Sequence, residues 1–194
     1  GGMDVFTGRK DSEEFISKLT KVYELTDDYE DIRNIDRKII CADGRMDLAA
    51  TQGTIDLLAK TTKYGINKLN NENKDGFFLM VEGAKIDYAG HANSLGGAIV
   101  EMLSFDLAIA EALKFADENG ETLVVVTADH ETGGLTLIDG DRETGLITGY
   151  FVTDDHTPIM LPVFAYGPQS NSFNGVYNNT EIFHKILKTL NISS

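Results

Sequence analysis

The predicted fold rests on one stretch of sequence, Leu123-Val124-Val125-Val126-Thr127-Ala128-Asp129-His130-Glu131-Thr132-Gly133-Gly134. Its continuous apolar start is typical of a strand that helices cover on both faces of a parallel sheet. Asp129 and His130 follow directly, and such groups are costly to desolvate unless they are paired or bind a metal. Neighbouring strand residues point to opposite faces, so both can meet one ion only if the backbone turns, which Gly133 and Gly134 allow. On this segment alone, loop residues satisfied by the backbone are an equally good interpretation.

Outside this stretch, short apolar runs alternate with longer amphipathic segments. The predicted strands are residues 22–25, 38–42, 77–81, 123–127 and 161–166, and the predicted helices are residues 12–19, 28–35, 54–70, 95–119 and 180–190. This alternation predicts an α/β fold with a mainly parallel sheet flanked by helices. We expect residues 1–194 to form one such domain.

A different pattern occupies residues 134–150 and predicts a small antiparallel hairpin appended to the sheet. Two apolar runs, Leu135-Thr136-Leu137-Ile138 and Leu146-Ile147-Thr148, enclose Asp139-Gly140-Asp141. Asp and Gly are the residues that turns require, so Asp139 and Asp141 are interpreted as turn residues rather than metal ligands.

Two further segments place metal-ligand side chains beyond predicted strands, where open α/β sheets bind ligands. In the first, Glu82 ends the run 77–81, and Asp87 and His91 are four residues apart, which puts them on one face of a helical turn. Alone, this spacing is also that of an ordinary surface pair. In the second, His156 follows two aspartates and precedes the strand 161–166. His184 lies inside a predicted helix and is interpreted as a packing or surface residue.

The charge excludes some partners. With 17 Lys and Arg against 31 Asp and Glu, the net charge is −14, which disfavours nucleic acid and anionic membrane surfaces. An anionic substrate would therefore need a local source of positive potential, and bound divalent metals are the usual one. The sequence contains no apolar run of 18 residues, so no membrane span is predicted. Cys41 is the only cysteine, so an intramolecular disulfide is excluded.

Taken together, the three segments resemble alkaline phosphatases. The resemblance rests on Val81-Glu82-Gly83-Ala84-Lys85-Ile86-Asp87 with His91, on residues 127–134, and on His156-Thr157 followed by Val163-Phe164-Ala165-Tyr166-Gly167-Pro168. It implies the C-terminal portion of an alkaline phosphatase catalytic domain, active on phosphate monoesters with two zinc ions and one magnesium ion. The ligands it implies are Asp87, His91 and His156 for the first zinc, Asp129 and His130 for the second zinc, and Glu82 for magnesium.

The resemblance also implies a serine nucleophile, which no residue of this sequence matches. The Asp11-Ser12 pair precedes Glu13-Glu14 and is typical of a helix start. Gly1-Gly2-Met3-Asp4 resembles the interior of a longer chain. We therefore expect the nucleophile in an N-terminal half of the protein that this chain lacks, and no hydrolysis by this chain alone. By the same resemblance, the whole protein is expected in the periplasm or outside the cell.

A sheet interrupted between strands would expose a backbone edge, which would allow a homodimer to form. Two other functions stay open on the sequence. One is a phosphodiesterase of the same superfamily, and the other is a non-catalytic metal-binding or interaction module.

Overall fold

The computed structural model describes residues 2–47 and 50–192. These residues fall into two compact units. Unit 1 is drawn from Gly1–Lys85 and Ile99–Ala108, and unit 2 from Ile86–Ala98 and Ile109–Ser194. The long helix α5 (Leu95–Asn119) contributes residues to both units. That residues 1–194 belong to one catalytic domain stays a prediction.

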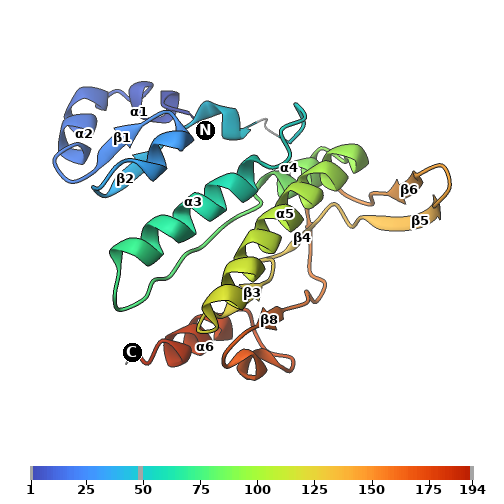
Figure 1. Ribbon diagram of the computed structural model, residues 1–194. Coiled ribbons are helices and arrows are strands. Elements are labelled where there is room, and N and C mark those ends of the chain that lie inside the picture. Colours follow the sequence, from blue (N-terminus) through green and yellow to red (C-terminus); the bar gives the residue numbers. More distant parts are fainter. Residues whose placement is uncertain (1, 48–49, 193–194) are drawn as a thin grey trace. The chain divides into compact units, whose positions relative to one another are not determined.

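Unit 1 contains a short parallel strand pair with helices before and after it (Figure 1). Strands β1 (Glu24–Thr26) and β2 (Ile39–Cys41) pair in the register Leu25↔Ile40. The helices are α1 (Asp4–Thr7), α2 (Ser12–Leu19) and α3 (Leu57–Glu72), and the 3₁₀ helices are η1 (Tyr29–Arg33) and η2 (Gly44–Asp47). The predicted helix 12–19 is confirmed.

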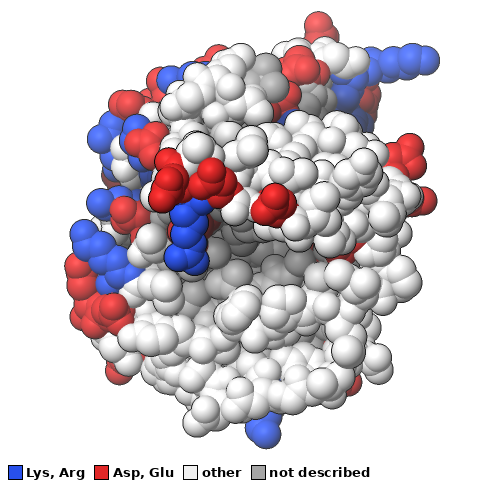
Figure 2. Space-filling model, turned by 90° about the vertical axis from the view of Figure 1, so that its right-hand side faces the viewer, with Lys and Arg blue, Asp and Glu red and all other residues white. Residues whose placement is uncertain are grey.

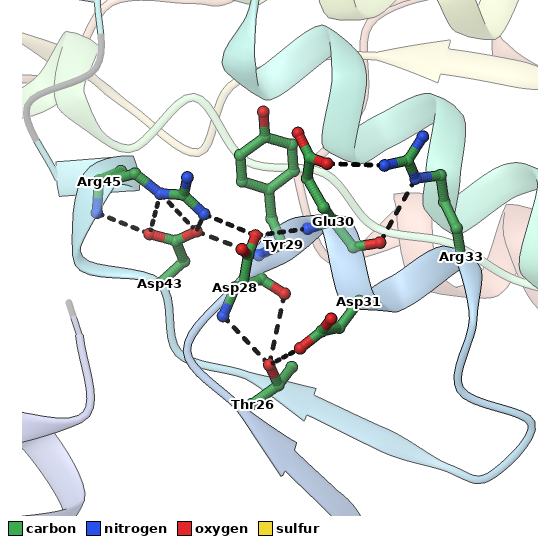
Figure 3. Close-up of polar contacts among 8 residues, drawn as sticks. All are labelled: Thr26, Asp28, Tyr29, Glu30, Asp31, Arg33, Asp43 and Arg45. Atoms are coloured by element: carbon green, nitrogen blue, oxygen red, sulfur yellow. Dashed lines mark hydrogen bonds and ion pairs between the residues drawn. The ribbon is translucent and has the colours of Figure 1, made fainter.

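A polar network joins the two loops that follow strands β1 and β2 (Figure 3). The Asp43 carboxylate, 3% exposed, accepts hydrogen bonds from the backbone N–H groups of Tyr29 (3.1 Å) and Arg45 (2.9 Å). The Arg45 guanidinium donates to Asp43 and, at 2.7 Å, to Asp28. Asp28 precedes η1 after β1, and Asp43 follows β2. The network therefore ties the loops after both strands together.

The described residues of unit 2 form three antiparallel strand pairs, with helices before and after them. Strand β3 (Val124–Val126) pairs with β8 (Phe164–Tyr166), β4 (Glu131–Thr132) with β7 (His156–Thr157), and β5 (Thr136–Asp141) with β6 (Leu146–Tyr150). Besides the two ends of α5, the helices are α4 (Lys85–His91), whose first residue still belongs to unit 1, and α6 (Glu181–Thr189). The 3₁₀ helix η3 spans Ser170–Phe173. The β5–β6 pair confirms the predicted hairpin at 134–150.

The structure differs from the predicted helices and sheet at three places. Residues 77–81 form no strand, because they are part of none of the β-ladders among the described residues. The predicted helix 28–35 is the shorter 3₁₀ helix η1, in which the Asp28 side chain accepts from the Glu30 N–H. The mainly parallel sheet is not confirmed: among the described strands, β1–β2 is the one parallel pair, and each sheet has two strands.

Apolar surface remains exposed on both units. Buried apolar residues include Leu57 and Ile66 in unit 1 and Phe173 in unit 2, whereas Leu137 and Leu146 of the hairpin are more than half exposed. Figure 2 shows one face of the molecule, where acidic and basic side chains are neighbours and much of the remaining surface is uncharged. In the described part of the chain, no helix combines the length and the hydropathy that a membrane crossing requires.

We predict that Asp43 makes unit 1 acid-sensitive. Hydrogen bonds from Arg45 lower the pKa of Asp43 to about 2 despite its burial. Because this folded-state pKa lies below the unfolded value of about 3.9, the stabilisation is complete above pH 4 and is lost as the pH falls through 2. We expect Asp43→Asn to lower the free energy of unfolding by about 2 kcal/mol at pH 6, and the difference to shrink toward zero at pH 2. Urea unfolding followed by circular dichroism measures this, with the exposed Asp27→Asn as control. A difference that is unchanged between the two pH values would contradict the assignment.

Candidate metal centre

Three predicted ligands from two distant segments of unit 2 meet at one point. Helix α4 places Asp87 and His91 one turn apart, with Asp87 Oδ1 3.3 Å from His91 Nε2. His156 enters from β7, and its Nε2 lies 3.1 Å from His91 Nε2 and 3.6 Å from Asp87 Oδ1. In a tetrahedral zinc site with bonds of 2.0–2.2 Å, neighbouring ligand atoms are about 3.3–3.6 Å apart. The two distances to Asp87 fall within this range, and the distance of 3.1 Å between the two histidine nitrogens is slightly shorter.

His130 is the fourth candidate ligand near this point, and its ring contacts His156. The two imidazole rings stack with centroids 3.5 Å apart and planes inclined by 19°. His130 Nδ1 is 4.0 Å from Asp87 Oδ1, and His130 Nε2 is 3.3 Å from Asp129 Oδ2. Asp87, His130 and His156 thus also form a group whose ligand atoms lie within 4.8 Å of one another. His130 can serve either this group or a separate site with Asp129.

The loops that carry His130 and His156 are joined by strands β4 and β7, in which Glu131 pairs with Thr157. The Glu131 carboxylate accepts from the N–H groups of Gly134 (3.0 Å) and Leu135 (3.1 Å) and from the Thr157 hydroxyl. Burial alone would raise the pKa of Glu131, but these hydrogen bonds outweigh it, and the pKa is lowered. Gly133 and Gly134 have positive φ angles of 90° and 60°, so the predicted turn after His130 is confirmed.

The orientation of His91 is set by a backbone carbonyl. Its Nδ1 lies 2.6 Å from the carbonyl oxygen of Asp154, an acceptor, so Nδ1 carries the proton and Nε2 faces Asp87 and His156. The same hydrogen bond raises the pKa of His91; burial opposes it, and the carboxylates of Asp87 and Asp155 add to it. A ligand imidazole whose other nitrogen donates to a carbonyl is the usual arrangement in metal sites.

The remaining predicted residues lie elsewhere or at the margin. Asp129 is 84% exposed. Glu82 is an exposed residue of unit 1, in the irregular segment before α4. His184 is exposed on α6 with its ring edge-on to Phe183, in agreement with its interpretation as a surface residue. Asp141, the last residue of β5, accepts from the N–H groups of the turn residues 143 and 144, as a turn residue should. Asp139 was wrongly predicted as a turn residue, because β5 continues through it and it pairs with Thr148.

Two contributors to the site were missed by sequence reasoning. Thr132 hydrogen-bonds to Asp87 and approaches His130, and the carbonyl of Asp154 holds His91. Thr132 could have been found from the sequence, because its hydroxyl follows His130 by two residues and so lies close to a candidate ligand. A backbone carbonyl leaves no signal in the sequence.

Comparison with known proteins assigns the family. The sequence model of the family described as alkaline phosphatase matches residues 40–150. The chain belongs to the alkaline phosphatase family. It is 32% identical to alkaline phosphatase 3 of Bacillus subtilis, over 87% of this chain and 52% of that protein. It is 39% identical to alkaline phosphatase H of Pseudomonas aeruginosa, over 71% of this chain and 32% of that protein.

Solved structures place the fold in the same family. The alkaline phosphatase from the Antarctic bacterium TAB5 matches with a TM-score of 0.85 and 37% identity, over 100% of this chain and 59% of that chain. A mutant of the TAB5 enzyme solved with magnesium bound also has a TM-score of 0.85, with 36% identity over 100% of this chain and 60% of that chain. The chain thus spans between about a third and three fifths of the length of these four chains. Its fold is that of the alkaline phosphatases.

We predict that Glu131 holds the two histidine loops together. Glu131→Ala removes the acceptor for two backbone N–H groups and one hydroxyl, and each partly buried donor left unsatisfied costs about 1–3 kcal/mol. The melting temperature should fall by several degrees, and amide exchange at residues 131–135 and 156–157 should accelerate. Glu143→Ala, at the exposed hairpin turn, is the matched control. If amide exchange in these segments is equally fast in both variants, Glu131 does not hold the two histidine loops together.

Proposed function

We propose that this chain contributes the metal ligands of a phosphate monoester hydrolase. The observation that carries the proposal is the convergence of Asp87, His91 and His156 at 3.1–3.6 Å from segments 65 residues apart. Three protein ligands with an open fourth position are typical of a catalytic rather than a structural zinc. Membership of the alkaline phosphatase family supports the reaction class.

In the proposed assignment, Asp87, His91 and His156 hold the first zinc, and Asp129 and His130 hold the second. Glu82 is the proposed magnesium ligand, because a carboxylate oxygen is what this hard cation prefers. The magnesium-bound TAB5 mutant, 36% identical, supports a magnesium ion in the family. A pair of zinc ions, when bound, clamps the attacking and leaving oxygens of a phosphoryl transfer.

This chain's own residues have positioning roles in the proposal. The Asp154 carbonyl keeps the proton of His91 on Nδ1, away from the ligand position. Glu131 keeps the His130 and His156 loops at one distance through Thr157. Because the chain carries a net charge of −14, metal binding also supplies the positive potential that an anionic phosphate ester needs.

The nucleophile is assigned to no residue of this chain. Ser12, the one serine that follows an aspartate in the sequence, lies at the start of α2 in unit 1. We propose that the serine belongs to a further, N-terminal part of the same catalytic domain and that the whole protein is exported to the periplasm or the medium. Its partner would be a phosphate monoester, and a homodimer would bury the exposed apolar surface.

Zinc titration tests the ligand assignment. Isothermal calorimetry at pH 8 should show about one zinc bound tightly and a second bound more weakly, because fewer ligands define the second site. His91→Ala and His156→Ala should each weaken the tight site at least 100-fold, since each removes one of three ligands. His130→Ala should affect mainly the weak site, and His184→Ala should match the unsubstituted chain.

Two results would reject the assignment. One is an absence of zinc binding. The other is tight binding that survives His91→Ala but not His130→Ala, which would assign the ion to the alternative group of Asp87, His130 and His156.

A second prediction concerns turnover. Hydrolysis of p-nitrophenyl phosphate by these 194 residues with saturating zinc and magnesium should be undetectable, because the ligands alone provide no nucleophile. Addition of the complementary part of a family member, or expression of a longer chain, should restore it. Measurable turnover by these residues that His156→Ala abolishes would show that the nucleophile lies within them. Preference of the longer chain for a bis-aryl phosphate diester would favour a phosphodiesterase.

A further inference from the structure

One hydroxyl group links the two proposed zinc sites. Thr132 Oγ1 lies 2.5 Å from Asp87 Oδ1 and 3.2 Å from His130 Nδ1. Asp87 belongs to the proposed first site and His130 to the proposed second. The Thr132 side chain is half-buried, so water competes only partly for these hydrogen bonds.

The number of protons decides the direction of both hydrogen bonds. A hydroxyl has one proton to donate, and an ionised carboxylate can only accept. Thr132 therefore donates to Asp87, and its oxygen is left as an acceptor for His130. The Nδ1 of His130 must then carry the N–H. A neutral imidazole has one N–H, so the free lone pair of His130 is on Nε2.

The free nitrogen faces a second ligand rather than the first site. His130 Nε2 is 3.3 Å from Asp129 Oδ2, whereas its Nδ1 is the atom near Asp87. Without a metal ion, the Asp129 carboxylate competes for a proton on Nε2, but it is 84% exposed and screened by water, whereas the Thr132 hydroxyl acts on Nδ1 from a half-buried position. A protonated Nδ1 cannot bind an ion together with Asp87 and His156. Distances alone allow His130 to bind an ion either with Asp87 and His156 or with Asp129. The hydrogen bond to Thr132 favours binding with Asp129.

Packing holds the Thr132 side chain in this place. In the β4–β7 pair, Thr132 stands opposite His156. On the α4 side it lies against Gly90, where an added Cβ would be 2.8 Å from Thr132 Cβ and 2.9 Å from Thr132 Cγ2. A glycine at position 90 thus lets α4 approach β4 closely enough for the hydroxyl to reach Asp87.

We propose that Thr132 is a positioning residue that holds His130 as its Nδ1–H tautomer, so that Nε2 is presented to a metal ion bound with Asp129. This inference rests on the proposed function, because it concerns ligands of the same centre. It adds a residue and a ligand atom to that centre. The hydroxyl also couples the two sites, since one side chain orients a ligand of each.

The tautomer is measured directly on the metal-free chain. Long-range ¹H–¹⁵N correlation spectra of the histidine side chains at pH 8 distinguish Nδ1–H from Nε2–H, and a His130→Gln spectrum assigns the signals. We expect Nδ1–H at His130 in the unsubstituted chain and in Thr132→Ser. In Thr132→Val, which keeps the shape and removes the hydroxyl, this preference should be lost. An Nε2–H tautomer in the unsubstituted chain, or an unchanged Nδ1–H in Thr132→Val, would overturn the proposal.

Zinc affinity provides the second measurement. Loss of a hydrogen bond to a ligand typically weakens metal binding 10–100-fold. We expect a weakening of about this size at the second site in Thr132→Val, recovery to within about threefold in Thr132→Ser, and no change in Thr136→Val, an exposed threonine of β5. Equal weakening in Thr132→Val and Thr132→Ser would assign Thr132 a purely structural role and reject the proposal.

The two proposals fail in different ways. Absence of zinc binding in the unsubstituted chain rejects the proposed function, while the tautomer measurement, which needs no metal, still decides the role of Thr132. Zinc binding that depends on His156 but is indifferent to Thr132→Val upholds the function and rejects the positioning role. If Thr132→Val does not fold, the tautomer of the unsubstituted chain is decisive.

Discussion

The pairing of β4 with β7 is the contact on which the candidate metal centre depends. It joins two loops that are about 25 residues apart in sequence, yet it contains two residue pairs. So short a ladder has few backbone hydrogen bonds, and side chains must supply much of its stability. The Glu131 carboxylate does so by accepting the Thr157 hydroxyl, and the Gly133 N–H adds a hydrogen bond to the Asp155 carbonyl (2.9 Å). The position of His156 relative to His130 follows from these contacts.

The short distance between two ring nitrogens of the centre requires either a hydrogen bond or a metal ion between them. His91 Nε2 and His156 Nε2 are 3.1 Å apart, and His91 already uses the proton on Nδ1 to reach the Asp154 carbonyl. Its Nε2 lone pair therefore points at another ring nitrogen, and two lone pairs at this distance repel each other. In the free chain, an N–H on His156 Nε2 that donates to His91 Nε2 relieves the repulsion. A metal ion between the nitrogens and Asp87 would relieve it in the bound state, provided that His156 carries its hydrogen on Nδ1 instead.

The sequence predicted the parts of the fold that local signals define. Helix α5 has both predicted bounds because Ser94 caps its start and Gly120, with a φ of 73°, ends it. The run 77–81 was wrongly predicted as a strand because apolar content alone does not provide a partner. The candidate ligand residues were named from their motifs, and their role as ligands stays a prediction, whereas the groups that hold them in place were not predicted. Contacts such as His91 to Asp154, across 63 residues, depend on the tertiary structure and have no local pattern.

The distances between the candidate ligands do not by themselves show which of them would bind the same ion. The stacked rings of His130 and His156, 3.5 Å apart, bring the ligands of two sites so close that one carboxylate, Asp87, is near three imidazoles. Two ions of equal charge can occupy such neighbouring positions only if each has its own lone pairs to bind. In the proposed arrangement, the proton positions assign the ligands to two groups. The Asp154 carbonyl holds the proton of His91 on Nδ1, so that Nε2 faces Asp87. The Thr132 hydroxyl holds the proton of His130 on Nδ1, so that Nε2 faces Asp129 instead of Asp87. In the proposed two-ion centre, hydrogen bonds behind the ligands would therefore decide which ion each ligand binds.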